Sequence, residues 1–244
     1  HLAEHARRLA RTQAVETEPS RGRPLRPLVR DALGDLTAAY RDLAEAGRAG
    51  ETLTPAAEWL LDNYHIVRDQ AREAEAAMPR AYYRVLPKLT AGPYQGLPRA
   101  YELVENLADL TDNDLSVEHL RGFVAGYQEV ELLTLAELWA LPLLLRVVLA
   151  QRVAALARPL REARADRLAA ATWAETLAAH DDPAEVSADL AAIAREQAPL
   201  SGPFAMTFAA ALPAAGGRGT AMEWLEHRLR ARRLTLDDVE RIET

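Results

Sequence analysis

The sequence contains no cysteine among its 244 residues. This absence excludes disulfides, thiolate zinc sites and a cysteine nucleophile. Lysine is nearly absent as well, since Lys88 is the single one, so P-loop and Schiff-base chemistry each have one candidate residue. Aromatic residues make up only 6% of the chain, whereas alanine and leucine dominate. That composition favours helices and argues against a β-sandwich.

An excess of positive charge and a long apolar run are also missing. The formal net charge is -7, so binding to nucleic acid through phosphate neutralisation is not expected. The most apolar run, Leu138 to Leu145, is short, contains Pro142 and is followed by Arg146. This pattern predicts a buried core helix rather than a membrane span. The first residues do not resemble a signal peptide. Because the chain begins at His1, we expect it to be a segment of a longer polypeptide.

Helical periodicity runs through the chain, and no segment shows the sustained alternation of a β-strand. Thr54 and Ser116 are placed to cap helices, and Thr134 with Glu137 forms a capping box at the start of the longest helical run. Pro159 allows a break or kink in that run. The Tyr/Pro-rich stretch 80–98 is expected to be a loop with at most a short helical turn.

The sequence therefore predicts an all-α fold, an irregular multi-helix bundle with a Tyr/Pro-rich loop and proline-kinked helices. We treat residues 1–244 as one helical domain. Its expected parts are N-terminal helices over 1–50, a central portion over 51–160 and C-terminal helices over 161–244.

Glu58, Asp62, His65 and Asp69 recur at intervals of four, three and four, which places them on one helix face. Two carboxylates beside a histidine are suited to metal binding or proton transfer. The preferred interpretation is nevertheless a solvated or inter-helix polar face, because HExxH spacing is absent and no second histidine lies nearby.

Most of the aromatic side chains gather in one third of the chain, with basic residues between them. The set consists of six tyrosines, two tryptophans and four basic residues: Tyr64, Tyr82, Tyr83, Tyr94, Tyr101, Tyr127, Trp59, Trp139, Arg80, Arg84, Lys88 and Arg99. Aromatic faces beside charged groups suit sugar rings. Spacing alone slightly favours the alternative, in which the tyrosines pack a proline-rich loop onto the core.

Several blocks of the sequence carry a resemblance to a known family: PAAEWLLDNYHIV at 55–67, PRAYYRVLPKL at 79–89, GPYQGLPR at 92–99, YQEV at 127–130, LTLAELWALP at 133–142 and WLEHRL at 224–229. In the same order, these blocks resemble the N-terminal cytoplasmic region of bacterial cyclic β-1,2-glucan synthases. The resemblance covers most of the chain and is strongest from Thr54 to Ala157.

The resemblance implies a helical accessory or priming domain of a membrane glycosyltransferase. The complete enzyme would use UDP-glucose and a divalent metal, whereas this segment is expected to hold no cofactor, no metal and no catalytic residue. The implied partners are the transferase core and membrane helices of the same polypeptide, with β-1,2-glucan as a further one. The implied location is the cytoplasmic face of the bacterial inner membrane.

Candidate residues follow from the same resemblance. Tyr82 and Tyr83, expected in a loop beside the helix of Glu58, are the candidate anchors for growing glucan, because a phenol can attack an activated anomeric carbon once its proton is removed. The candidate contacts to glucan or to another domain are Glu58, Trp59, Asp62, His65, Arg84, Lys88, Tyr94, Arg99 and Trp139.

Two other functions stay open. One is a helical protein-interaction domain that makes no carbohydrate contact. The other is a helical hydrolase that uses Glu58 and Asp62, which is the least favoured, because adjacent turns of one helix do not usually flank a glycosidic bond.

Overall fold

The helices begin where the sequence places caps. In the computed structural model, which describes residues 1–180, 182–195, 200–212 and 218–243, the Thr54 hydroxyl accepts from the backbone N–H of Ala57 (3.3 Å), and Ser116 does the same for His119 (3.1 Å). Thr134 and Glu137 form the predicted capping box, with bonds of 2.8 and 3.2 Å between side chain and backbone. The all-α prediction is confirmed.

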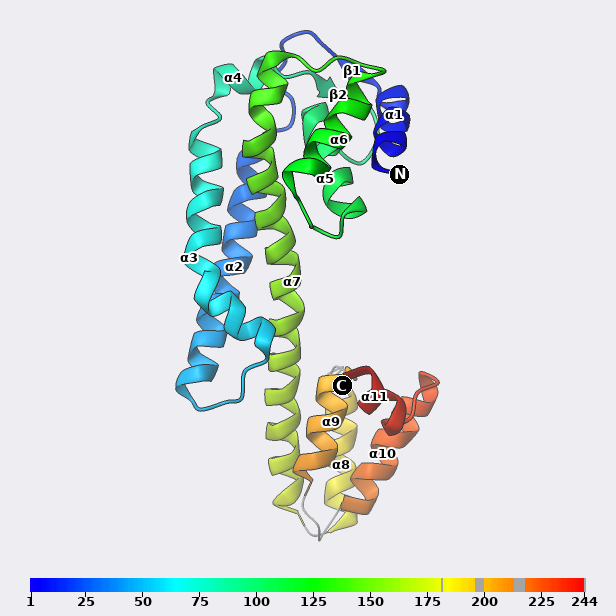
Figure 1. Ribbon diagram of the computed structural model, residues 1–244. Coiled ribbons are helices and arrows are strands. Elements are labelled where there is room, and N and C mark those ends of the chain that lie inside the picture. The colour runs from blue at the N-terminus through cyan, green and yellow to red at the C-terminus, as the bar shows by residue number, and fades with distance from the viewer. Residues whose placement is uncertain (181, 196–199, 213–217, 244) are drawn as a thin grey trace. The chain divides into compact units, whose positions relative to one another are not determined.

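The described residues form two units, His1–Arg158 and Pro159–Thr244. The first contains six complete helices, α1 (Leu2–Thr12), α2 (Leu25–Arg48), α3 (Pro55–Ala76), α4 (Arg80–Val85), α5 (Arg99–Leu110) and α6 (Val117–Gln128) (Figure 1). Helix α7 (Leu135–Ala178) begins in the first unit and ends in the second, so helix continues through both Pro142 and Pro159. The break that Pro159 allows is not formed.

Two features of the first unit differ from the expected loop over 80–98. Arg80–Val85 is the six-residue helix α4, and Lys88–Leu89 forms strand β2. That strand pairs antiparallel with β1 (Val15–Glu16), with Val15 opposite Leu89 and Glu16 opposite Lys88. Strands of two residues are too short to leave an alternating pattern in the sequence.

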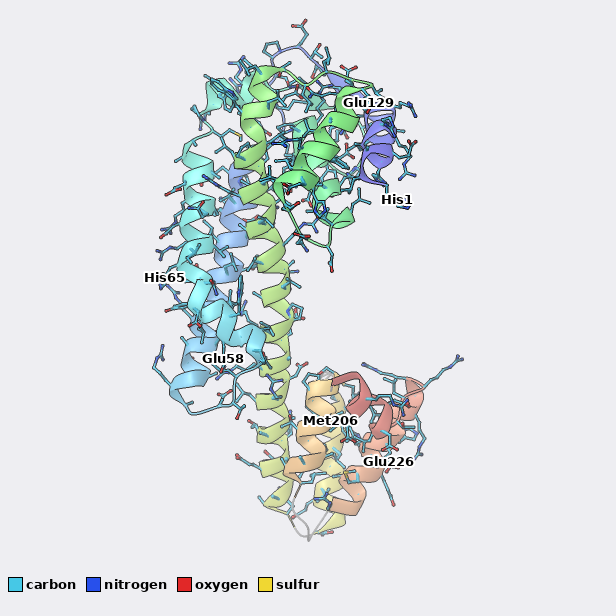
Figure 2. All side chains as sticks on the ribbon, in the orientation of Figure 1. His1, Glu58, His65, Glu129, Met206 and Glu226 are labelled. Carbon is cyan, nitrogen blue, oxygen red and sulfur yellow. The ribbon has the colours of Figure 1, made fainter. Side chains whose placement is uncertain are left out.

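The core of the first unit is built around α5 and the first half of α7. Leu103, Val104 and Leu107 from α5 are fully buried, as are Leu144 and Val148 from α7. Helix α1 packs on α6. The close approach depends on Gly126, because a Cβ atom there would lie 2.7 Å from the Cα of Ala3. Arg7 of α1 and Glu129, seen beside α1 in Figure 2, form an ion pair of 2.7 Å at the same contact.

The second unit has its own core. It contains the last part of α7 with α8 (Pro183–Arg195), α9 (Gly202–Ala211), α10 (Arg218–Ala231) and α11 (Leu236–Glu243). Phe204 and Phe208 stack with ring centroids 5.5 Å apart, and Leu225 and Ile193 are buried with them.

Among the described residues, α7 is long and apolar enough to cross a membrane, with a mean hydropathy of 1.7 over an 18-residue window. Some 44% of that window is buried inside the protein. The first half of α7 packs in the core of the first unit, which accounts for part of this composition.

Candidate functional site

The residues that the sequence singles out fall into two groups in the first unit. Glu58, Trp59, Asp62 and His65 lie in the first half of α3. The others lie on α4 and after it. At 1.5 Å per residue, about 27 Å of helix separates Glu58 from Ala76, where α3 ends. Glu58 and Asp62 are therefore not beside Tyr82 and Tyr83, which lie on a helix rather than in a loop.

The group on α3 faces solvent. Glu58, Asp62 and His65 are exposed, and Figure 2 labels Glu58 and His65. The imidazole of His65 packs edge-on against Tyr64, with centroids 5.1 Å apart. Asp69 is hydrogen-bonded to Arg68 (2.8 Å), and that bond lowers the pKa of Asp69. No cluster of metal-binding side chains occurs in the part of the chain that the structure describes.

The two candidate anchor tyrosines both donate their hydroxyl protons to backbone carbonyls. Tyr82 donates to Ala136 and Tyr83 donates to Arg23. A carbonyl cannot take up the proton that a nucleophilic phenol must lose. Burial also raises the pKa of both phenols. The anchor role stays a prediction, and these contacts favour a structural role for both side chains.

Lys88, the single lysine, is buried with 2% of its surface exposed. Its ammonium donates to the carbonyls of Tyr83 (2.6 Å) and Leu86, and lies 4.5 Å from the centre of the Tyr83 ring. Burial lowers the pKa of Lys88 to about 8, against the smaller opposing attraction of Glu137 and Glu16. These bonds hold the turn between α4 and β2.

Arg99, at the start of α5, forms a buried ion pair with Glu137 of α7. The side chains are 3% and 0% exposed, and two nearly parallel bonds of 2.6 and 3.0 Å join them. Burial alone lowers the pKa of Arg99, but the hydrogen bond and charge of Glu137 outweigh it, so the pKa lies above its ordinary value. Arg99 also donates to the carbonyl of Leu132 (2.8 Å) and to Glu131 (3.2 Å).

This ion pair belongs to a larger set of contacts. The guanidinium of Arg99 lies 5.8 Å from the centre of the Tyr127 ring, and Tyr127 donates to Gln13, which donates in turn to Glu102 (2.8 Å). We call Arg99, Glu137, Tyr127 and Gln13 the buried polar network. It joins the ends of α1, α5, α6 and α7.

The segment held by this network exposes large apolar side chains. Leu132, Leu135 and Trp139 are 73%, 65% and 69% exposed. We call these three residues the α7 apolar surface. Leu135 and Trp139 are one turn apart on one helix face. Glu137, two residues from each, points about 200° away around the helix into the core. Contacts on the buried side therefore fix the direction in which the exposed side chains project.

Three hydrogen bonds to the backbone hold the segment that carries this surface. Arg99 holds the carbonyl of Leu132, Glu137 accepts from the N–H of Thr134, and Tyr82 holds the carbonyl of Ala136. The three partners, Arg99, Glu137 and Tyr82, come from α5, α7 and α4. A fixed arrangement of exposed apolar side chains is suited to binding another surface, since little conformational entropy is lost when it docks.

The structure brings some of the predicted residues together and leaves others apart. Tyr83, Lys88 and Arg99 meet in or beside the buried polar network, whereas Trp59 and Trp139 are exposed on different helices. Tyr94 packs against Tyr101 at 5.6 Å, and the Arg84 side chain is exposed. Leu132 and Leu135 were missed as site residues, although the capping box beside them marks where α7 begins.

Lys88 should give the protein an unusual dependence on pH. Its pKa falls from 10.5 when unfolded to about 8 when folded, so the unfolded chain binds more protons between these values and stability rises with pH there. From pH 8 to 9.5 we expect the free energy of unfolding to increase by about 1.5 kcal/mol. Urea titrations at several pH values, compared with the Lys88→Met variant, measure it. An equal slope in the variant would contradict this assignment.

The chain is similar to a known enzyme over part of its length. It is 36% identical over 149 residues to cyclic beta-(1,2)-glucan synthase NdvB of Rhizobium meliloti (strain 1021), which confirms the resemblance seen in the sequence. The matched region covers 61% of this chain and 5% of the synthase, so the chain corresponds to a small part of that protein. No protein-family model matches the chain.

Proposed function

We propose that this chain is a helical accessory segment of a cyclic β-1,2-glucan synthase, and that its α7 apolar surface docks on another region of the same polypeptide. The observation that carries the proposal is the exposure of Leu132, Leu135 and Trp139. The backbone of their segment is hydrogen-bonded on its buried side to Arg99 and Glu137 of the buried polar network. The match to the synthase suggests what docks on the α7 apolar surface, namely another region of the same polypeptide, because most of that enzyme lies outside the matched 5%.

Polypeptide docking is favoured over direct binding of glucan at this surface. A sugar site needs polar groups beside the aromatic face, to bind the hydroxyls. Here the neighbours of Trp139 on the exposed face are apolar, and the nearby charges of Arg99 and Glu137 are buried and bonded to each other. An apolar patch with a central tryptophan is typical of a protein–protein contact.

The other parts of the role come from the resemblance. The complete polypeptide would polymerise glucose from UDP-glucose with a divalent metal, at the cytoplasmic face of the bacterial inner membrane. The segment would dock on the transferase core and position it or the glucan. These statements apply to the complete enzyme, of which this chain would be a non-catalytic part.

Photo-cross-linking tests the docking. A photo-reactive phenylalanine analogue would replace Leu132 in the complete polypeptide that contains this segment, and Ile66 of α3 provides a matched control because it is 63% exposed against 73% for Leu132. We expect the probe at 132 to join peptides outside residues 1–244, and the probe at 66 to give none. Adducts to a separate protein would favour the general interaction domain. Equal yields at both positions would contradict the proposal.

A further inference from the structure

Three arginines line a groove between α2 and α3, in a chain that is acidic overall. The groove has a volume of about 480 Å³ and is lined by Arg30, Leu33, Gly34, Thr37, Ala38, Arg41, Arg72 and Glu75. The two helices pack side by side. On α2, Arg30, Gly34, Thr37 and Arg41 recur at intervals of four, three and four, which places them on one face.

The positive charge of the groove is not cancelled by its one lining carboxylate. Glu75 is already paired with Arg26 at 2.5 Å. Arg30 is itself paired with Asp31, at 3.4 Å. Asp69, one turn before Arg72, is hydrogen-bonded to Arg68. The three lining arginines therefore outnumber the one lining carboxylate, and Arg30 has a counter-ion outside the lining.

Gly34 provides a second, independent observation. Glycine inside a helix is less stable than alanine, so its presence there calls for a reason. Close packing is not the reason, because a Cβ atom at this position would meet nothing within 4 Å. The missing side chain instead opens the wall of the groove between Arg30 and Arg41, where a ligand can approach the backbone.

We propose that this groove binds a phosphoryl group, either of a soluble phosphate or diphosphate compound or of a lipid headgroup. Guanidinium groups match phosphate oxygens in planar, bidentate geometry. Three lining arginines against one lining glutamate leave an excess of positive charge, which suits an anion. The groove is separate from the α7 apolar surface, so this inference does not depend on the docking proposal.

Titration of the 244-residue chain with inorganic pyrophosphate, followed by calorimetry, tests the inference. We expect saturable binding that weakens as salt is added. Arg41→Ala and Arg72→Ala should each lower the affinity about five- to tenfold. Arg121→Ala is the matched control, because Arg121 is an exposed arginine of α6 and lies outside the groove. Absence of binding, or an equal loss in the control, would overturn the inference.

Gly34→Ala separates folding from binding. This change should raise the midpoint of thermal unfolding, because alanine favours helix, and yet weaken pyrophosphate binding, because a methyl group enters the groove. A variant that is more stable and binds equally well would show that the wall at Gly34 is not used, contradicting the site.

Vesicles distinguish the two sources of the phosphoryl group. Sedimentation with vesicles of phosphatidylglycerol, compared with phosphatidylcholine, reports headgroup binding. Retention by phosphatidylglycerol that is lost in Arg41→Ala and Arg72→Ala assigns the groove to lipid. Pyrophosphate binding without retention assigns it to a soluble ligand. Retention that the two variants leave unchanged, together with no pyrophosphate binding, would overturn the site.

Discussion

Replacing Glu137 with alanine is expected to lower the free energy of unfolding by about 3–5 kcal/mol, because it leaves the guanidinium of Arg99 buried without its main counter-charge. Glu131 cannot substitute fully, since it is 54% exposed and meets Arg99 with one bond of 3.2 Å. The change also removes the two bonds that the Glu137 carboxylate accepts from Thr134 at the start of α7. Urea unfolding, followed by tryptophan fluorescence and circular dichroism, measures the loss.

An exposed ion pair of the same type provides the control. Arg158 of α7 and Asp35 of α2 are 3.0 Å apart, with side chains 63% and 43% exposed. Asp35→Ala should cost at most about 1 kcal/mol. The double variant Arg99→Met with Glu137→Leu should recover a large part of the loss, because no uncompensated charge stays in the core. Equal losses for Glu137→Ala and Asp35→Ala would contradict the role given to the buried polar network.

Much of the helical fold can be predicted from local signals in the sequence, such as helix caps. The caps at Thr54, Ser116 and Thr134 were predicted from residue type and spacing, and the structure contains all three. These signals act over three or four residues, which is why a single sequence carries them. The pairing of β1 with β2 was not readable, because Val15 and Leu89 are brought together by the packing of helices around them.

Only part of the site could be predicted from the sequence, because its contacts also join residues that are far apart in the chain. Lys88 and Arg99 stand out as cations among aromatics, which predicted ligand contacts, yet both are buried and bonded within the protein. The partner of Arg99 is 38 positions away, at Glu137, whose capping role was visible whereas its ion pair was not. The exposure of Leu132 and Leu135 depends on whether other helices of the folded chain cover them, and the sequence pattern does not show this.

Replacing Leu135 and Trp139 together with alanine is expected to reduce glucan formation by the complete polypeptide about tenfold or more. Large side chains at the centre of a docked surface each contribute about 2 kcal/mol or more when they are hot spots, and a loss of 1.4 kcal/mol is tenfold in an equilibrium. The isolated 244-residue chain should keep its stability within about 0.5 kcal/mol, because both side chains are mostly exposed and alanine favours helix.

The control for this change is built into the chain. Ile66 of α3 and Leu156 of α7 are 63% and 70% exposed and lie outside the α7 apolar surface. The most direct measurement is incorporation of radiolabelled glucose from UDP-glucose into glucan by membranes that carry the complete polypeptide. We predict that Leu135→Ala with Trp139→Ala abolishes most incorporation and that Ile66→Ala with Leu156→Ala retains it. Normal incorporation in the double variant, at equal protein levels, would contradict docking through this surface.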